Sequence, residues 1–154
     1  LLRHKESVSP LEDLVSGGFR PVIDEVEAID AGGVRRVVAC SGKVYFDLVA
    51  ARRERKIGNI AIVRIEQLYP FPHDDFKRAL GRFPNASELL WAQEEPKNQG
   101  AWYWLQHYLR DPMLPGQTLR SVSRPSSAAP AGGYLDVHRA QQQALVDEAL
   151  KLGA

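Results

Sequence analysis

The chain is 154 residues long, and 44% of its residues are hydrophobic while 25% are charged. This composition is typical of a single folded globular domain and excludes a disordered chain. Its 20 basic and 19 acidic residues leave a formal net charge of +1, which excludes a strong overall attraction to nucleic acid or to an anionic membrane surface.

The first residues carry no targeting signal. The stretch from Leu1 to Lys5 lacks the apolar run of a signal peptide, and no part of the sequence reaches the roughly 18 apolar residues that a membrane span requires. Because the sequence begins without an initiator methionine, we expect it to be a segment of a longer polypeptide. Residues 1–18 mix charges with a helix-start signal at Ser9 and Pro10, and they predict a linker with one short helix.

A strand is predicted over residues 19–27, and from there short β-branched runs alternate with helical patterns. Further strands are predicted over 36–40, 60–65, 88–93 and 118–122, and helices over 43–55, 74–82, 101–110 and 137–152. This alternation is typical of a parallel sheet with helices on both faces. We therefore predict a three-layer α/β fold for residues 19–154.

Polar residues follow each of the predicted parallel strands. The carboxyl ends of such strands meet at one edge of the sheet, where helix N-termini supply free N–H groups. That edge gathers one hydroxyl and three cations, from Ser41, Lys43, Arg64 and Arg124. These groups predict a pocket for a phosphate or a carboxylate.

A structural alternative stays open for the same residues. Ser41 is well placed merely to cap the helix over 43–55, and the two arginines could pair with acidic groups of the edge, namely Glu66, Glu94 and Glu95. Arg52 and Arg53 lie at the end of that helix, where the negative end of the dipole disfavours an anion. They rank second as phosphate contacts.

Trp102, Tyr103 and Trp104 stand together at the start of the helix over 101–110. Three adjacent aromatic side chains cannot all point into one core, so we expect some of them to cover a partner surface. The alternative is that they wedge the helix onto the sheet.

No residue pattern supports independent catalysis. The four histidines His4, His73, His107 and His138 lack metal-ligand spacing, and no second cysteine accompanies Cys40. The sequence contains neither a phosphate-binding glycine loop nor a nucleophile elbow. We predict no catalytic and no metal-binding residue, and we expect Cys40 to be a reduced, buried intracellular thiol.

Three longer strings go beyond these patterns: residues 1–5 (LLRHK), 63–72 (VRIEQLYPFP) and 93–103 (QEEPKNQGAWY). Residues 41–45 (SGKVY), 124–130 (RPSSAAP) and 141–143 (QQQ) match the same region. Together they resemble the C-terminal end of the thiamine-diphosphate-dependent first component of 2-oxoglutarate dehydrogenase. The similarity covers nearly the whole chain.

The resemblance implies a transketolase-like C-terminal domain whose sheet is mostly parallel, with residues 19–27 as the one antiparallel strand. In that family, thiamine diphosphate and Mg²⁺ lie between two preceding domains of an obligate homodimer. The dimer oxidatively decarboxylates 2-oxoglutarate in the citric acid cycle and transfers the succinyl group to the lipoyl-bearing succinyltransferase component of the multienzyme complex. The family's diphosphate and metal motifs have no counterpart here, so we expect no cofactor in this segment and no activity from it alone.

What the resemblance implies instead is a supporting role in dimer assembly and in shaping the approach to the active site. Some family members also hold AMP or acetyl-CoA in this domain. We place such an effector in the predicted anion pocket. Its phosphates would contact Ser41, Lys43, Arg64 and Arg124, with Gln93 or Glu94 near the adenosine.

Two rival functions fit the same residues. One is an independent regulatory module that binds a nucleotide or acetyl-CoA, and the other is a pure subunit-interface domain whose aromatic segment docks a partner. The frequent Arg, Ala and Pro residues favour a bacterial cytoplasm over a mitochondrial matrix. The choice between 2-oxoglutarate and 2-oxoadipate depends on residues outside the segment.

Overall fold

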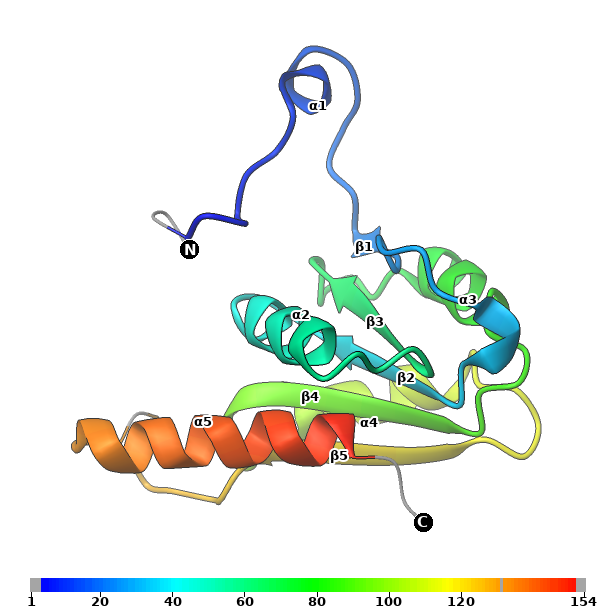
Figure 1. The fold of residues 1–154 in the computed structure, drawn as a ribbon. Coiled ribbons are helices and arrows are strands. Elements are labelled where there is room, and N and C mark those ends of the chain that lie inside the picture. Colours follow the sequence, from blue (N-terminus) through cyan, green and yellow to red (C-terminus); the bar gives the residue numbers. More distant parts are fainter. Residues whose placement is uncertain (1–3, 131, 152–154) are drawn as a thin grey trace.

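The computed structural model describes residues 4–130 and 132–151, and it contains one five-stranded sheet (Figure 1). The strands are β1 (Val22–Ile23), β2 (Arg36–Cys40), β3 (Ile60–Ile65), β4 (Glu88–Pro96) and β5 (Thr118–Arg124), in the spatial order β1-β3-β2-β4-β5. β1 runs antiparallel to β3, and the other neighbours are parallel. The predicted α/β fold with one antiparallel strand is confirmed.

Helices cover both faces of the sheet. They are α2 (Val44–Glu54), α3 (His73–Gly81), α4 (Trp102–Arg110) and α5 (Leu135–Leu150). The chain also contains a short helix, α1 (Leu11–Val15), and a 3₁₀ turn at Ala31–Gly33. α3 and α4 pack against one apolar cluster and α2 and α5 against the other. Within the described ranges, no helix is long and apolar enough to cross a membrane.

The two clusters follow from the alternation of side chains along buried strands. In β2, Val37 and Ala39 face the cluster under α3 and α4, whereas Val38 and Cys40 face the cluster under α2 and α5. All five residues of β2 are buried, as expected for a central parallel strand that helices cover on both sides. Because each cluster is closed by its own pair of helices, we expect the chain to fold on its own.

β1 is much shorter than the predicted strand over 19–27. Only Val22 and Ile23 pair with β3, opposite Ile65 and Arg64. The next part of the β3 edge is paired by a side chain instead, because the carboxylate of Glu25 accepts a hydrogen bond from the Ile62 N–H at 2.7 Å. The Glu25 carboxylate thus replaces a backbone hydrogen bond between the strands at this point of the β3 edge.

β4 is longer than predicted, and the helix ends differ by one or two residues. Residues 93–96 stay extended because Pro96 still pairs with Arg124 of β5, after an irregularity in the register that begins at Ala92. β4 therefore carries its last residues further over the edge of the sheet than its apolar run indicates.

Candidate functional site

A pocket of about 310 Å³ opens at the carboxyl end of β2 and β4, and we call it the rim pocket. Four of the six predicted effector contacts line it: Ser41, Lys43, Gln93 and Glu94. The other lining residues are Gly42, Leu68, Trp91, Glu95, Gln99, Gly100 and Ala101. The parallel topology brings these residues together from three separate stretches of sequence.

Ser41 does not cap α2. The helix begins at Val44, and Lys43 occupies the cap position in a helical conformation, with no capping bond from a side chain. Gly42 has a φ of +73° and turns the chain between Ser41 and the helix. The expected cap is therefore wrong, and Ser41 lies in the wall of the rim pocket instead.

The charges at the rim are largely paired, as the structural alternative predicted. Lys43 Nζ lies 2.8 Å from Asp47 Oδ2 and 3.9 Å from Glu94 Oε2. Gln142 of α5 donates to the same Asp47 oxygen at 2.8 Å and approaches Glu94 Oε2 at 3.5 Å. An anion entering the pocket would have to compete with these carboxylates for Lys43.

Arg64 lies outside the rim pocket. Its guanidinium carbon sits 4.3 Å from the ring centre of Tyr45, and its Nε lies 3.5 Å from Glu66. Strand alternation turns Arg64 toward the first turn of α2, where it lines a different hollow beside the N-terminal linker. Placing Arg64 with Ser41 and Lys43 was therefore wrong.

Arg124 also points away from the rim pocket. It is buried, and its guanidinium contacts His138 at 2.8 Å and donates to Gln142 Oε1 at 2.6 Å, both on α5. It reaches the rim only indirectly, because Gln142 in turn approaches Glu94. Arg124 therefore joins β5 to α5, and it does not line the rim pocket with Ser41 and Lys43 as the sequence predicted.

Gln93 holds the turn between β4 and α4. Its side chain is 2% exposed, and Oε1 accepts hydrogen bonds from Trp91 Nε1 at 2.9 Å and from the Trp102 N–H at 3.0 Å. Its Nε2 donates to the Pro96 carbonyl at 3.2 Å. Because the protein occupies both ends of the amide, Gln93 has a structural role in the pocket wall.

Gly100 gives room for this amide, which leads to a testable expectation. A Cβ at Gly100 would lie 2.1 Å from Gln93 Nε2, so Gly100→Ala has to displace a buried side chain that makes four hydrogen bonds. We expect a loss of about 1 to 3 kcal/mol in the free energy of unfolding, measured by urea denaturation.

Gly81→Ala is the matched control, because nothing lies within 4 Å of a Cβ built at this residue near the end of α3. It should leave stability unchanged or raise it by up to about 1 kcal/mol. Equal stability of the two variants would contradict the role assigned to Gln93.

The three aromatic residues of α4 divide between core and surface. Trp102 is 8% exposed and belongs to the core cluster under α3 and α4, whereas Tyr103 is 58% and Trp104 is 36% exposed. Trp102 thus wedges the helix onto the sheet, which removes it from the predicted interface. Sequence reasoning missed Tyr69, an exposed ring whose centre lies 6.1 Å from that of Trp104.

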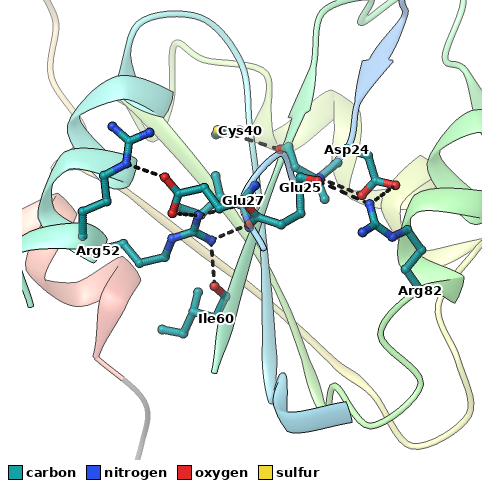
Figure 2. A network of polar contacts seen from close by, with 10 residues as sticks. Asp24, Glu25, Glu27, Cys40, Arg52, Ile60 and Arg82 are labelled. Atoms are coloured by element: carbon teal, nitrogen blue, oxygen red, sulfur yellow. Dashed lines mark hydrogen bonds and ion pairs between the residues drawn. The ribbon is translucent and has the colours of Figure 1, made fainter. Parts of the chain in front are cut away.

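A buried ionic cluster, which the sequence reading also missed, closes the edge of β3 (Figure 2). Arg52 Nη2 donates to Glu25 Oε1 and to Glu27 Oε2 at 2.8 Å each, while Nη1 donates to the Ile60 carbonyl at 3.0 Å and pairs with the second oxygen of Glu25. We call Glu25, Glu27 and Arg52 the edge clamp. The signal in the sequence was the acidic run over 24–27 beside an apolar strand.

Arg52 and Arg53 are accordingly committed to carboxylates. Arg53 pairs with Glu27 and, at 2.8 Å, with Glu6 of the N-terminal linker. Burial alone would raise the pKa of Glu27, but the hydrogen bonds from Arg53 and Arg52 outweigh burial and hold that pKa below its usual range. Both guanidinium groups are occupied by carboxylates, so neither is free to contact a phosphate as the second-ranked prediction required.

Cys40 is buried, and its thiol lies 3.8 Å from the Val63 carbonyl. Burial raises the pKa of this thiol, which keeps it neutral and unreactive, so the expected buried thiol is confirmed. Across residues 4–130 and 132–151, no three His, Cys, Asp or Glu side chains form a group that could hold a metal ion. We assign no catalytic step to these residues.

Comparison with known proteins identifies close relatives. A family model described as 2-oxoglutarate dehydrogenase C-terminal matches residues 8–150. The 2-oxoglutarate dehydrogenase E1 component of Cupriavidus necator is 51% identical over 149 residues, and that of Coxiella burnetii is 49% identical over 154 residues. The matches cover 97% and 99% of this chain, but the chain spans only 16% of each relative.

Proposed function

Because the chain belongs to the 2-oxoglutarate dehydrogenase C-terminal family, we propose that it is the supporting, non-catalytic domain of a larger first component. The proposal rests on the share of this chain and the share of each relative that the alignments cover. Nearly all of the chain aligns with relatives named as E1 components, yet it accounts for 16% of their length. The chemistry of the parent enzyme would therefore belong to the other 84% or so of the polypeptide.

The parent enzyme, in this proposal, is a homodimer in a bacterial cytoplasm that uses thiamine diphosphate and Mg²⁺. It decarboxylates 2-oxoglutarate and passes the succinyl group to a lipoyl-bearing succinyltransferase. The residues described here offer no group of metal ligands, so they do not fit a Mg²⁺ site, and we derive no step of the reaction from them. The proposal assigns the cofactor to the preceding domains.

The rim pocket is the part of the domain that we propose to bind an effector such as AMP or acetyl-CoA. Lys43 would contact a phosphate, and Ser41 and Glu94 would line the same wall. Leu68 supplies part of the apolar surface that an adenine ring requires. Competition from Asp47 and Glu94 for Lys43 predicts modest affinity in the isolated chain.

The effector proposal is tested by the melting temperature of the chain with AMP, with acetyl-CoA, or with thiamine diphosphate plus Mg²⁺. At a ligand concentration about 100 times the Kd, we expect AMP or acetyl-CoA to raise the melting temperature by roughly 5 to 10 °C. Lys43→Ala should abolish the shift. Lys77→Ala, an exposed cation on α3, should keep it and serves as the control.

Two outcomes would contradict these proposals, one for the location of the cofactor site and one for the effector site. A shift with thiamine diphosphate plus Mg²⁺ would contradict a cofactor site outside this domain. A shift with AMP that survives Lys43→Ala would contradict the rim pocket as the effector site.

The exposed aromatic residues favour subunit assembly as a second role. Tyr69 and Trp104 lie beside each other at the surface, and paired aromatic residues are frequent anchors of protein interfaces. Replacing both with alanine should raise the dissociation constant of the parent dimer at least about tenfold, as measured by sedimentation velocity. Tyr134→Ala removes an equally exposed ring at the start of α5 and should leave the constant unchanged.

A further inference from the structure

The N-terminal linker carries an apolar surface that its own domain does not cover. α1 contains no buried residue. Five large apolar side chains around it are between 69% and 79% exposed, and we call them the apolar arm: Val8, Leu11, Leu14, Val15 and Phe19. A concentration of exposed apolar side chains over 12 consecutive positions, 8 to 19, marks an interaction surface rather than ordinary scatter.

The helical residues of the arm share one face. Leu11, Leu14 and Val15 stand at positions i, i+3 and i+4, the spacing of side chains that lie side by side on a helix. A helix of five residues is too short to be stable in water by its own hydrogen bonds. It needs packing on that face.

The arm has one ion pair within the linker itself and one to the body of the domain. Arg20 pairs with Asp13 at 3.2 Å, and Glu6 pairs with Arg53 of α2 at 2.8 Å. Between these ties the linker loops away from the sheet, as Figure 1 shows. The arm therefore stands away from the sheet and is not packed on it.

Two hollows in the surface lie next to the arm. One, of about 490 Å³, lies between Val8 and the side chains of Tyr45 and Phe46 on α2. Another, of about 520 Å³, lies between Leu14 and Phe19, and Ile23 of β1 lines both. An inserted apolar segment could contact the arm and the body of the domain at once.

We propose that the apolar arm docks onto an apolar surface of the same polypeptide, in the part of the parent protein that precedes this domain. This inference rests on the proposed function as one domain of a longer enzyme. The chain spans 16% of its relatives and matches a family described as C-terminal, so most of the parent protein lies before it.

A contiguous domain is favoured over a second copy for a physical reason. Covalent linkage gives a neighbouring domain an effective concentration in the millimolar range, whereas a second copy of the isolated chain must lose its own translational and rotational freedom on binding. The Glu6–Arg53 pair places the N-terminal side of the arm beside α2 of its own domain.

The experiment compares hydrogen exchange at residues 11–19 in the full-length parent enzyme and in the 154-residue chain. We expect exchange to be slower by at least about tenfold in the parent enzyme, because docking buries the helix. Leu11→Asp with Leu14→Asp should abolish this difference and lower the melting temperature of the parent enzyme. The same double variant should leave the melting temperature of the isolated chain unchanged, because neither side chain is buried there.

Leu135→Asp with Val137→Asp is the matched control, since it places the same two charges at exposed apolar positions of α5, and it should keep the slow exchange. Equal exchange in the two proteins would overturn the proposal. Slow exchange in the isolated chain that increases with its concentration would also overturn it, in favour of a second copy. If the parent enzyme failed to oxidise 2-oxoglutarate, the proposed function would fail while a slow exchange at the arm still stood.

Discussion

Arg52→Met is expected to lower the free energy of unfolding of the chain by about 3 to 5 kcal/mol, as measured by urea denaturation. Arg52 and Glu25 are each 1% exposed as side chains, so the variant leaves a carboxylate buried without its main cation. It also deprives the Ile60 carbonyl of a donor. Methionine keeps much of the volume, so the loss reports the missing charge and hydrogen bonds.

Arg53→Met is the matched control for this prediction. It removes the neighbouring arginine, which also pairs with Glu27 but has a side chain that is 47% exposed. Solvent screens such a pair, so the control should cost at most about 1 kcal/mol. Similar losses for the two variants would contradict the claim that burial makes Arg52 critical.

Removing both partners of the buried pair should restore part of the stability. The double variant Glu25→Leu with Arg52→Met removes both charges of this pair, so neither position leaves an unpaired buried charge. Recovery should be incomplete, because the Ile62 N–H and the Ile60 carbonyl then lose their side-chain partners at the edge of β3. A double variant less stable than both single variants would show that the edge hydrogen bonds outweigh the charge.

The second large effect is expected for Arg36→Met, at about 3 to 5 kcal/mol in the same measurement. Arg36 is fully buried at the start of β2, and its Nε donates to Glu88 at 2.7 Å. Its Nη1 donates to the carbonyls of Ala149 and Lys151 at 2.8 Å each. One guanidinium thus neutralises a carboxylate of β4 and satisfies the C-terminal end of α5.

The effect of Arg36→Met should be concentrated in α5. Amide exchange there should increase more than in β2 and β3, because the last turn of the helix loses its partners. Arg120→Met is the control, since this half-exposed arginine pairs with Glu88 and Glu148 and should cost at most about 1 kcal/mol. Uniform exchange changes across the sheet would contradict a specific tie between Arg36 and α5.

Arg36→Lys separates charge from geometry. Lysine keeps the positive charge beside Glu88, but it lacks the planar fork that reaches Glu88 and the helix carbonyls together. Its stability should fall between those of the wild-type chain and Arg36→Met. A lysine variant as stable as the wild type would reduce the role of Arg36 to charge alone.

Strands with two buried faces were predictable from the sequence. The predicted bounds of β2 and β3, 36–40 and 60–65, agree with the structure. Their β-branched and small apolar residues are typical of the middle of a helix-covered sheet. The same pattern placed Ser41, Gln93 and Glu94 at one edge, because the direction of parallel strands determines where their ends meet.

The direction of each charged side chain was not predictable in the same way. Arg64 and Arg124 stand at the ends of their strands as expected, yet one packs on Tyr45 and the other binds α5. Which face a strand-end residue points to depends on the register of the sheet and on the helix that covers that face, and a one-residue change reverses it. A prediction based on strand ends alone therefore assigns more cations to the anion pocket than the folded domain places there.

The sequence by itself determined the class of fold, the order of its strands and helices, and the family to which the chain belongs. Local patterns suffice for the fold class and the order of elements, because burial period and turn residues act over a few neighbouring positions. The family follows from the longer matching strings, such as residues 93–103. Only the tertiary structure decided that Glu25 replaces part of a strand, that Arg36 secures α5 and that the apolar arm has no cover. Those facts depend on groups distant in the sequence, whose hydrogen bonds and burial exist only once the layers have packed.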